Sequence, residues 1–553
     1  MKQVLKAALV VSISALSVLS LAAQPLKKER AFTHADTLRG TYGPSRDWWD
    51  VTKYDLHVRF NIPDSSISGW NVIAFKTLKK GAVLQLDLQE PMILDSILAL
   101  GKENKWQQLA FRKDGNAYFI DVPAAGIGNT IAAYYHGKPR VARRPPWDGG
   151  LIWKKDKNKN PWVSVACQGL GASVWYPCKD HQADEPDSAE MHITIPDSLV
   201  CVGNGRFRGK ISNADGTAAY DWAVVNPINN YCIIPYIGKY VHFGEEYAGE
   251  KGKLDMDYWV LDYNLDKARE QFKDAPRMMK AFEYWFGPYP FYEDGYKLVE
   301  SPHLGMEHQS ATAYGNGYRN GYAGTDLSGT GWGKKWDFII VHESGHEWFA
   351  NNITSRDIGD MWIHEGFTNY SETLFTDYFY GKDAGNEYVQ GIRSNIRNDI
   401  PIIGPYNVNQ EGSGDMYYKA GNMLHMIRQV INDDEKFRKI LRGLNKTFYH
   451  QTVTTKQVED YISKQSKIDF SKLFDQYLRT TQVPVFEYKI EGYKLSFRYD
   501  SCVKGFNLPL RVKFKTWQWI KPTDQWQSLD YYPEGDVKFE ADPNFYIKTK
   551  KLD

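Results

Sequence analysis

Residues 338–350 read FIIVHESGHEWFA, and this stretch decides how the rest of the chain is interpreted. The apolar residues on both sides predict a buried helix within 336–351. His342 and His346 stand four residues apart, so a helix places both imidazoles on one face, where they can bind the same metal ion. Glu343 overhangs that face and can reach a water molecule held there. The stretch therefore predicts a metal site with Glu343 beside it as a group that can take up and release a proton.

A carboxylate that can complete this site follows in residues 360–367, which read DMWIHEGF. Glu365 gives a set of two histidines and one carboxylate, which leaves the fourth position of tetrahedral zinc open. An open position is typical of a catalytic zinc site and not of a structural one. Glu372 lies on the same face of the predicted helix as Glu365, and we expect it to hold one ligating histidine by a hydrogen bond.

Composition places the chain among soluble multidomain proteins. It has 553 residues, of which 42% are hydrophobic and 24% charged, so disordered and fibrous classes are excluded. Lys and Arg number 68 against 67 Asp and Glu, which leaves no general attraction for nucleic acid. The cysteines number five, without metal-type spacing, so buried free thiols and a disulfide pair both stay open.

The N-terminus has the character of an export signal. Lys2 and Lys6 precede an apolar run at 7–21, and Ser20-Leu21-Ala22 offers a small-x-small cleavage site. The alternative is a membrane anchor, but the run falls short of the roughly 20 residues that span a bilayer. We expect residues 1–22 to be removed. The mature protein should then lack a membrane span and lie in the periplasm or outside the cell.

Hydrophobic periodicity divides the mature chain into three parts, and the predicted fold is multidomain α+β. Residues 45–245 alternate in short runs and predict a β-rich domain, for example at Tyr54–Phe60 and Val83–Leu88. Residues 246–482 predict a mainly α domain, and residues 483–553 predict a small β domain. The expected helices lie at 266–286, 336–351, 365–380, 420–432, 435–446 and 456–464, the last with a capping box between Thr454 and Gln457.

The metal motif and three further segments resemble the zinc aminopeptidases of the aminopeptidase N and leukotriene hydrolase type, whose catalytic domain is thermolysin-like. Gly305-Met306-Glu307 is similar to the Gly-x-Met-Glu-Asn exopeptidase motif, although Leu304 and His308 depart from it. The run at 417–420, Tyr-Tyr-Lys-Ala, resembles a Tyr-x-Lys-Gly segment. Residues 167–168 and 175–178 resemble the part of the N-terminal domain that borders the site.

The resemblance implies a role for each matching residue. His342, His346 and Glu365 would hold one zinc ion per chain, and Glu343 would act as general base. Tyr417, with Tyr418 as the fallback, would stabilise the oxyanion. The substrate-binding residues would be Gln168, Gly305, Met306 and Glu307, with Glu307 and Gln168 binding the free amine of a peptide substrate.

These assignments favour a zinc aminopeptidase. One alternative is a zinc endopeptidase, which suits an open site but leaves Glu307 without a role. Another is a catalytically inactive, peptide-binding homologue, which predicts the loss of a ligand or of the base. We expect no counterpart of the family's long helical C-terminal domain after the terminal β segment, and therefore a more open site.

Overall fold

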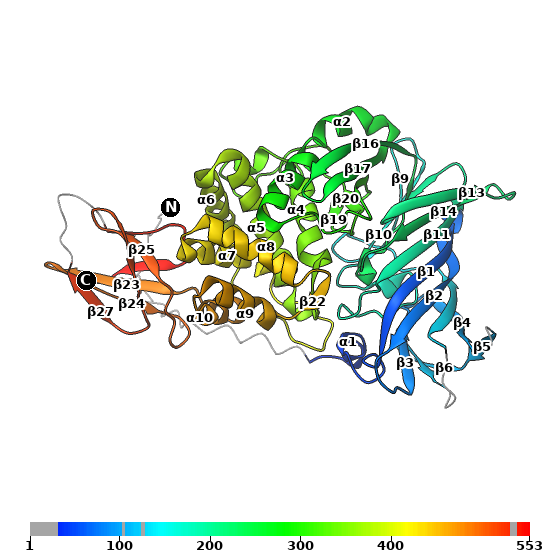
Figure 1. The fold of residues 1–553 in the computed structure, drawn as a ribbon, viewed down its shortest axis with the longest axis horizontal. Helices are drawn as coiled ribbons and strands as arrows, with labels where there is room; N and C mark the ends of the chain where they lie inside the picture. Colours follow the sequence, from blue (N-terminus) through cyan, green and yellow to red (C-terminus); the bar gives the residue numbers. More distant parts are fainter. Residues whose placement is uncertain (1–30, 102–104, 123–127, 531–538) are drawn as a thin grey trace, which may run out of the picture.

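The computed structural model describes residues 31–101, 105–122, 128–530 and 539–553. The predicted signal at 1–22 lies outside the described residues. A β-rich N-terminal part, a helical middle part and a C-terminal pair of sheets follow one another along the longest axis (Figure 1). The predicted α+β fold class is therefore confirmed.

The N-terminal part is built on an eight-stranded sheet of order β13-β14-β11-β1-β2-β8-β4-β5. In β1 the side chains of Tyr54, Leu56 and Val58 are buried, while Asp55 and His57 lie on the opposite, partly exposed face. This alternation is what the period-2 pattern predicts. The strands are β1 Trp49–Asn61, β2 Ser66–Thr77, β4 Ile93–Leu100, β5 Trp106–Leu109, β8 Thr130–Gly137, β11 Ser188–Pro196, β13 Arg206–Ser212 and β14 Thr217–Val224.

Two smaller sheets complete this part. One has the order β12-β15-β10-β9 and the other β3-β7-β6. Their strands are β3 Val83–Asp87, β6 Phe111–Asp114, β7 Ala117–Asp121, β9 Gly150–Lys155, β10 Pro161–Ala166, β12 Val200–Val202 and β15 Tyr236–Gly238.

The middle part contains a five-stranded sheet, of order β16-β17-β18-β20-β19, that the sequence did not single out. The predicted boundary between residues 245 and 246 falls inside β16, which pairs with β17 along its whole length. The edge strand β19 consists of Gly305 and Met306, so this sheet delivers the exopeptidase-like segment to the helices. Its strands are β16 Tyr240–Gly249, β17 Gly252–Leu261, β18 Tyr296–Glu300, β19 Gly305–Met306 and β20 Thr312–Tyr314.

Helix α5 lies at the centre of the middle part, where α3, α4, α6 and α7 pack against it, and its residues from Trp362 to Thr376 are all buried. The segment predicted as one helix at 266–286 forms two helices, α2 and α3. Pro276 lies in the first turn of α3, and its ring would clash with the carbonyl of Phe272 if the helix ran on without a break. The capping box of Thr454 and Gln457 is present. The helices are α2 Leu265–Gln271, α3 Asp274–Phe286, α4 Phe338–Gly345, α5 Trp362–Tyr380, α6 Lys382–Gly391, α7 Tyr418–Ile431, α8 Asp434–Thr447, α9 Thr455–Ser466 and α10 Ser471–Arg479.

The remaining elements lie at the ends of the chain and in one short pair. Helix α1, His34–Gly40, precedes the N-terminal sheet, and β21 Ile353–Ser355 pairs with β22 Gln451–Val453. The C-terminal sheets comprise β23 Val485–Glu491, β24 Lys494–Asp500, β25 Leu510–Lys513, β26 Trp517–Ile520, β27 Gln527–Asp530, β28 Glu540–Ala541 and β29 Lys548–Lys551. Within the described ranges, none of the helices has the length and apolar character needed to cross a membrane.

Candidate active site

Helices α4 and α5 bring the three predicted metal ligands together. Asp337 caps α4 by accepting from the amides of Ile339 and Ile340, which fixes where the helix begins. His342 and His346 follow on one face of it. Their Nε2 atoms lie 3.7 and 3.4 Å from Oε2 of Glu365. All three side chains are buried.

The Nδ1 atom of each histidine, which is the ring nitrogen that does not face Glu365, forms a hydrogen bond. Nδ1 of His342 lies 2.7 Å from Oε1 of Glu372, and Nδ1 of His346 lies 3.0 Å from the carbonyl oxygen of Phe349. Glu372 also accepts from Tyr388, 2.6 Å from its Oε2. With Nδ1–H donating in each ring, Nε2 carries the lone pair and faces Glu365. The contact expected of Glu372 is therefore present.

The donor set fits a zinc ion. Oε2 of Glu365 is buried, and no described residue forms a hydrogen bond with it. Buried carboxylate oxygens nearly always have a partner. Two imidazole nitrogens and this oxygen lie within 4.8 Å of one another, and two histidines with one carboxylate are a common catalytic zinc set.

Glu343 lies beside this group at the wall of the cavity. Burial raises the pKa of its carboxyl to about 7, and the neighbouring Glu307 adds to the rise while the histidines oppose it. Gly305 of β19 permits the close approach of the two segments: a Cβ at this position would lie 2.7 Å from Oε1 of Glu343. A larger residue at position 305 would therefore collide with the carboxylate of Glu343.

Glu307 is buried, with 3% of its surface exposed. Neutral side chains donate hydrogen bonds to one of its carboxylate oxygens, and the other oxygen has no such partner among the described residues. Its Oε1 accepts from Nε2 of Gln168 at 2.6 Å and from the hydroxyl of Tyr231 at 2.8 Å. Within the described part of the chain, no hydrogen bond or ion pair to Oε2 is formed. Burial raises the pKa of this carboxyl. The predicted pair of Glu307 and Gln168 thus lies together, and Tyr231 is a third member that the sequence did not indicate.

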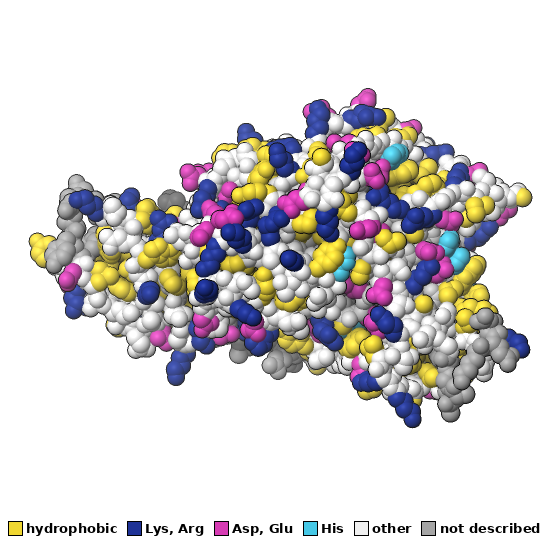
Figure 2. Space-filling view, viewed as in Figure 1, with side chains coloured by type: hydrophobic (Ala, Val, Ile, Leu, Met, Phe, Trp, Pro, Cys, Tyr) yellow, Lys and Arg dark blue, Asp and Glu magenta, His cyan; other side chains and the backbone are white. Residues whose placement is uncertain are grey.

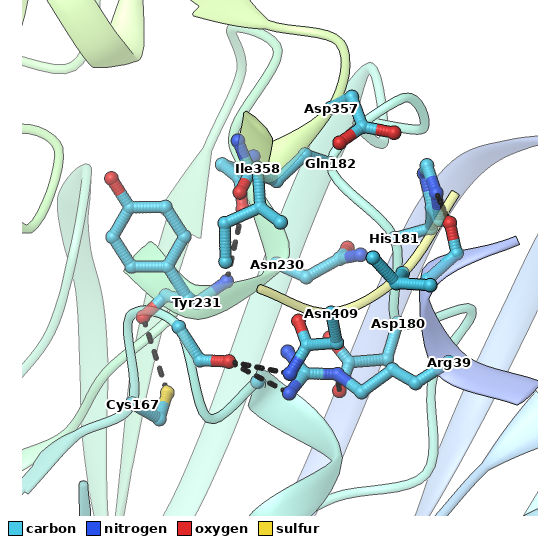
Figure 3. Close-up of a pocket in the computed structure, with 15 residues that line it drawn as sticks. Arg39, Cys167, Asp180, His181, Gln182, Asn230, Tyr231, Asp357, Ile358 and Asn409 are labelled. Carbon is cyan, nitrogen blue, oxygen red and sulfur yellow. Dashed lines mark hydrogen bonds and ion pairs between the residues drawn. The ribbon is translucent and has the colours of Figure 1, made fainter. Parts of the chain in front are cut away.

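A small cavity of about 40 Å³ has Cys167 and Gly169, the neighbours of Gln168 in sequence, in its wall (Figure 3). Arg39 of α1 donates to the carbonyl of Gly169 at 2.8 Å, and Asn409 donates to the same oxygen at 3.1 Å. Arg39 also pairs with Asp180 at 3.4 Å. The cavity is too small for a peptide. Its polar lining instead ties Gly169, the residue after Gln168, to α1 at the start of the described chain and to Asn409 of the middle part.

The main cavity measures about 770 Å³ and has the predicted metal and substrate residues in its wall. Tyr417 lines it with its ring centroid 6.0 Å from that of His342, and burial raises the pKa of its phenol, so the hydroxyl keeps its proton. Tyr418 lines it too. His303 and His308, which flank the exopeptidase-like segment, are buried and do not line this cavity. Nδ1 of His308 lies 2.5 Å from the hydroxyl of Tyr236.

Glu411 is a further carboxylate in the cavity wall that sequence reasoning missed. Burial raises the pKa of its carboxyl to about 7, and the charges of Glu365 and Glu307 add to this. It stands in an irregular loop before Tyr417, where no periodicity or motif marks it.

Comparisons of the sequence and of the structure relate this chain to known peptidases. Residues 271–477 match the model of the Peptidase family M1 domain. The chain is 21% identical over 400 residues to leukotriene A-4 hydrolase of Xenopus laevis, covering 68% of this chain and 60% of that one. It is 21% identical over 442 residues to human endoplasmic reticulum aminopeptidase 1, covering 76% and 44%, respectively. The chain thus spans 44% to 60% of the length of these two relatives.

Among solved structures, the M1 zinc metallopeptidase from Deinococcus radiodurans superimposes with a TM-score of 0.67 at 18% identity, covering 81% of this chain and 98% of that one. A mutant of that peptidase bound to a Tyr-Ser-Ala substrate gives the same TM-score of 0.67 at 17% identity, covering 81% and 98%. The chain therefore contains a Peptidase family M1 domain and is homologous to leukotriene A-4 hydrolase and endoplasmic reticulum aminopeptidase 1. The family resemblance drawn from the sequence is confirmed.

Proposed function

We propose that this protein is a zinc-dependent aminopeptidase, with one zinc ion at the catalytic centre of each chain. The observation that carries the proposal is the position of Glu307. Its carboxylate lies in the same cavity as the group of His342, His346 and Glu365, and its open Oε2 offers a charged acceptor for a substrate amine.

The metal would be held by the two Nε2 atoms and by Oε2 of Glu365. When bound there, zinc supplies a Lewis acid that polarises a peptide carbonyl and lowers the pKa of water. Glu343 then performs the proton transfers: its carboxylate takes a proton from the attacking water and delivers it to the leaving amine. Burial raises the pKa of this carboxyl above its ordinary value, which favours the second transfer, in which the carboxyl gives the proton to the leaving amine.

Tyr417 is placed to stabilise the oxygen on which charge develops. Its phenol is protonated at neutral pH and lines the cavity next to His342. A hydroxyl that is fixed before the reaction can donate to an oxyanion without the cost of reorganising solvent. Tyr418 begins α7 one residue later and stays the fallback donor.

Selectivity for the first residue would come from Glu307 and Gln168. A peptide's α-amine is largely protonated at neutral pH, since its ordinary pKa is about 7.7–8.0. The ammonium can pair with Oε2 of Glu307, and the side-chain oxygen of Gln168 can accept from it. Met306 and Gly305 line the adjoining wall. This anchoring places the first peptide bond, and no later one, beside Glu343.

Peptides with a free N-terminus are the proposed substrates. The Tyr-Ser-Ala complex of the structurally similar peptidase supports a short peptide as ligand. The basic and apolar start of the sequence supports export of the chain to the periplasm or beyond.

A panel of aminoacyl chromogenic amides tests the function. The purified chain should hydrolyse at least one of them, lose activity on removal of metal with a chelator and regain it with Zn²⁺. The variant Glu343→Gln is the matched control, because it keeps the metal ligands and the shape of the side chain. Equal activity in this variant would overturn the proposed mechanism, and hydrolysis of internal bonds alone would replace it with an endopeptidase.

A further inference from the structure

The wall of the main cavity carries an excess of negative charge. Among the described residues that line it, Arg397 is the one basic residue besides the two metal-binding histidines. The outer surface differs: acidic and basic side chains are interspersed over the face drawn in Figure 2, and the whole chain has 68 Lys and Arg against 67 Asp and Glu. The excess therefore belongs to the cavity. Its carboxylates are those of Glu307, Glu343, Glu365, Glu372, Glu411 and Asp415.

All of these carboxylates except that of Glu411 have a partner or a proposed role. Four belong to the metal site or act in the proposed reaction. Asp415 accepts at 2.8 and 2.6 Å from the backbone amides of Arg397 and Asn398. Glu411, which is half-buried, forms no hydrogen bond or ion pair with any residue in the described ranges of the chain. It is thus a carboxylate in the wall of a binding cavity that lacks a partner.

The backbone on both sides of Glu411 is fixed. Gly412 packs directly on a neighbouring segment, where a Cβ would collide with the carbonyl oxygen of Ile402. The side chain of Asn409 donates to the carbonyl oxygen of Gly169 at 3.1 Å. A side chain that is held by a rigid backbone can select among ligands without first being ordered by them.

Glu411 and Glu307 approach the same two residues of the N-terminal part. Nε2 of Gln168 donates to Oε1 of Glu307 at 2.6 Å. Gly169 is the next residue, and the point at which a Cβ on it would stand lies 3.2 Å from Oε1 of Glu411. A substrate residue whose amine is bound by Glu307 and Gln168 therefore has the carboxylate of Glu411 close to it as well.

A positively charged group is the ligand that this carboxylate favours. Burial raises the pKa of the Glu411 carboxyl to about 7, and the charges of Glu365 and Glu307 add to the rise. A cation beside the carboxylate would stabilise its charged form and offset that cost. The α-ammonium of a peptide is already matched by Glu307. The charge left for Glu411 to bind is that of a basic side chain.

We propose that Glu411 selects substrates whose first residue is basic, by pairing with the ammonium of lysine or the guanidinium of arginine. This inference rests on the proposed aminopeptidase function and names the substrate class of the same site. Glu411 would contact the substrate side chain and not the reacting atoms. It should therefore set the preference among substrates and leave the chemical step unchanged.

Steady-state kinetics on arginine and citrulline amides test the proposal, because citrulline has the shape of arginine without its charge. The wild type should show a kcat/KM at least about 10-fold higher on the arginine amide, a smaller effect than that of Glu307 because Glu411 is only half-buried. Glu411→Gln should remove this preference and change the rate on citrulline and leucine amides little. Glu387→Gln is the matched control, since Glu387 lies outside the cavity lining and accepts from Trp332 at 2.7 Å. It should keep the preference.

Two kinetic results would overturn the proposal. Equal rates of the wild type on arginine and citrulline amides would do so, and this comparison needs no variant to fold. An equal loss on every amide in Glu411→Gln would instead make Glu411 an acceptor of the α-amine. In either case hydrolysis of the leucine amide would leave the proposed aminopeptidase function standing.

Binding decides the question if the chain hydrolyses none of the amides, which would count against the proposed function. Calorimetry then compares L-argininamide with L-citrullinamide on the zinc-loaded full-length chain. Tighter binding of argininamide by about 10-fold in the wild type, and not in Glu411→Gln, would support selection by Glu411. Equal affinity of the wild type for the two amides would overturn it.

Discussion

Replacing Glu307 by alanine tests the anchoring of the substrate amine. In the structure one oxygen of this carboxylate is held by the neutral donors of Gln168 and Tyr231, and the other faces the cavity. No cation among the described residues pairs with it. A bound ammonium would therefore be the positive partner of a buried carboxylate.

The expected loss follows from that burial. Removing one partner of a buried, hydrogen-bonded charge pair costs about 2–5 kcal/mol. At about 1.4 kcal/mol per factor of ten, Glu307→Ala should lower kcat/KM on free-amine peptides by roughly 30-fold to several thousand-fold. Tyr231→Phe removes a single neutral hydrogen bond and should cost about 1 kcal/mol, close to fivefold.

Steady-state kinetics on one peptide in free and N-acetylated form measure this effect. The wild type should cleave the acetylated form poorly, and Glu307→Ala should change that rate little, because the acetylated amine carries no charge. Glu307→Gln is the informative companion, as it keeps the shape and loses the charge. A loss below fivefold in both Glu307 variants, with zinc content and fold retained, would refute amine anchoring by this residue.

Further substitutions test the other roles. Glu343→Gln should keep zinc by metal analysis yet lose nearly all turnover, because an amide cannot accept the proton; a kcat within tenfold of wild type would remove Glu343 as the base. Tyr417→Phe should lower kcat by about 10²–10³ with little change in KM, and the same loss in Tyr418→Phe instead would shift the role by one residue. Glu372→Gln should weaken zinc binding by about 10- to 100-fold in competition with a chelating dye, and unchanged affinity would contradict its support of His342. Gly305→Ala should lower kcat by about 10- to 100-fold, since its Cβ would stand 2.7 Å from Oε1 of Glu343 and displace it; wild-type kcat would show that the segment can move.

The metal-binding residues could be predicted from the sequence because they lie a few residues apart within single helices. His342 and His346 share a helix face by periodicity alone, and the position of Glu372 on the face of Glu365 follows from the same rule. The capping box at Thr454 was equally local. The break between α2 and α3 is local as well, because Pro276 disfavours helical geometry in the turn that precedes it.

Other parts of the site depend on tertiary packing that no local pattern reveals. Tyr231 reaches Glu307 from a short turn in the N-terminal part, and Glu411 enters the cavity from an irregular loop. The sheet from β16 to β20 joins strands that are separated by helices and loops, and β18 and β20 pair in parallel. Such contacts are set by the packing of the whole fold and not by the spacing of neighbouring residues.

Mass spectrometry of the products from one unlabelled peptide tests the central claim most directly. The zinc-loaded chain is incubated with a peptide of about ten residues, free and N-acetylated, and products are followed over time. If the protein is a zinc aminopeptidase, the free peptide should give a series of products that lack one residue after another from the N-terminus. The acetylated peptide should give no fragments, and neither peptide should give products after chelation. Internal fragments that appear at equal rates from both peptides would contradict the account.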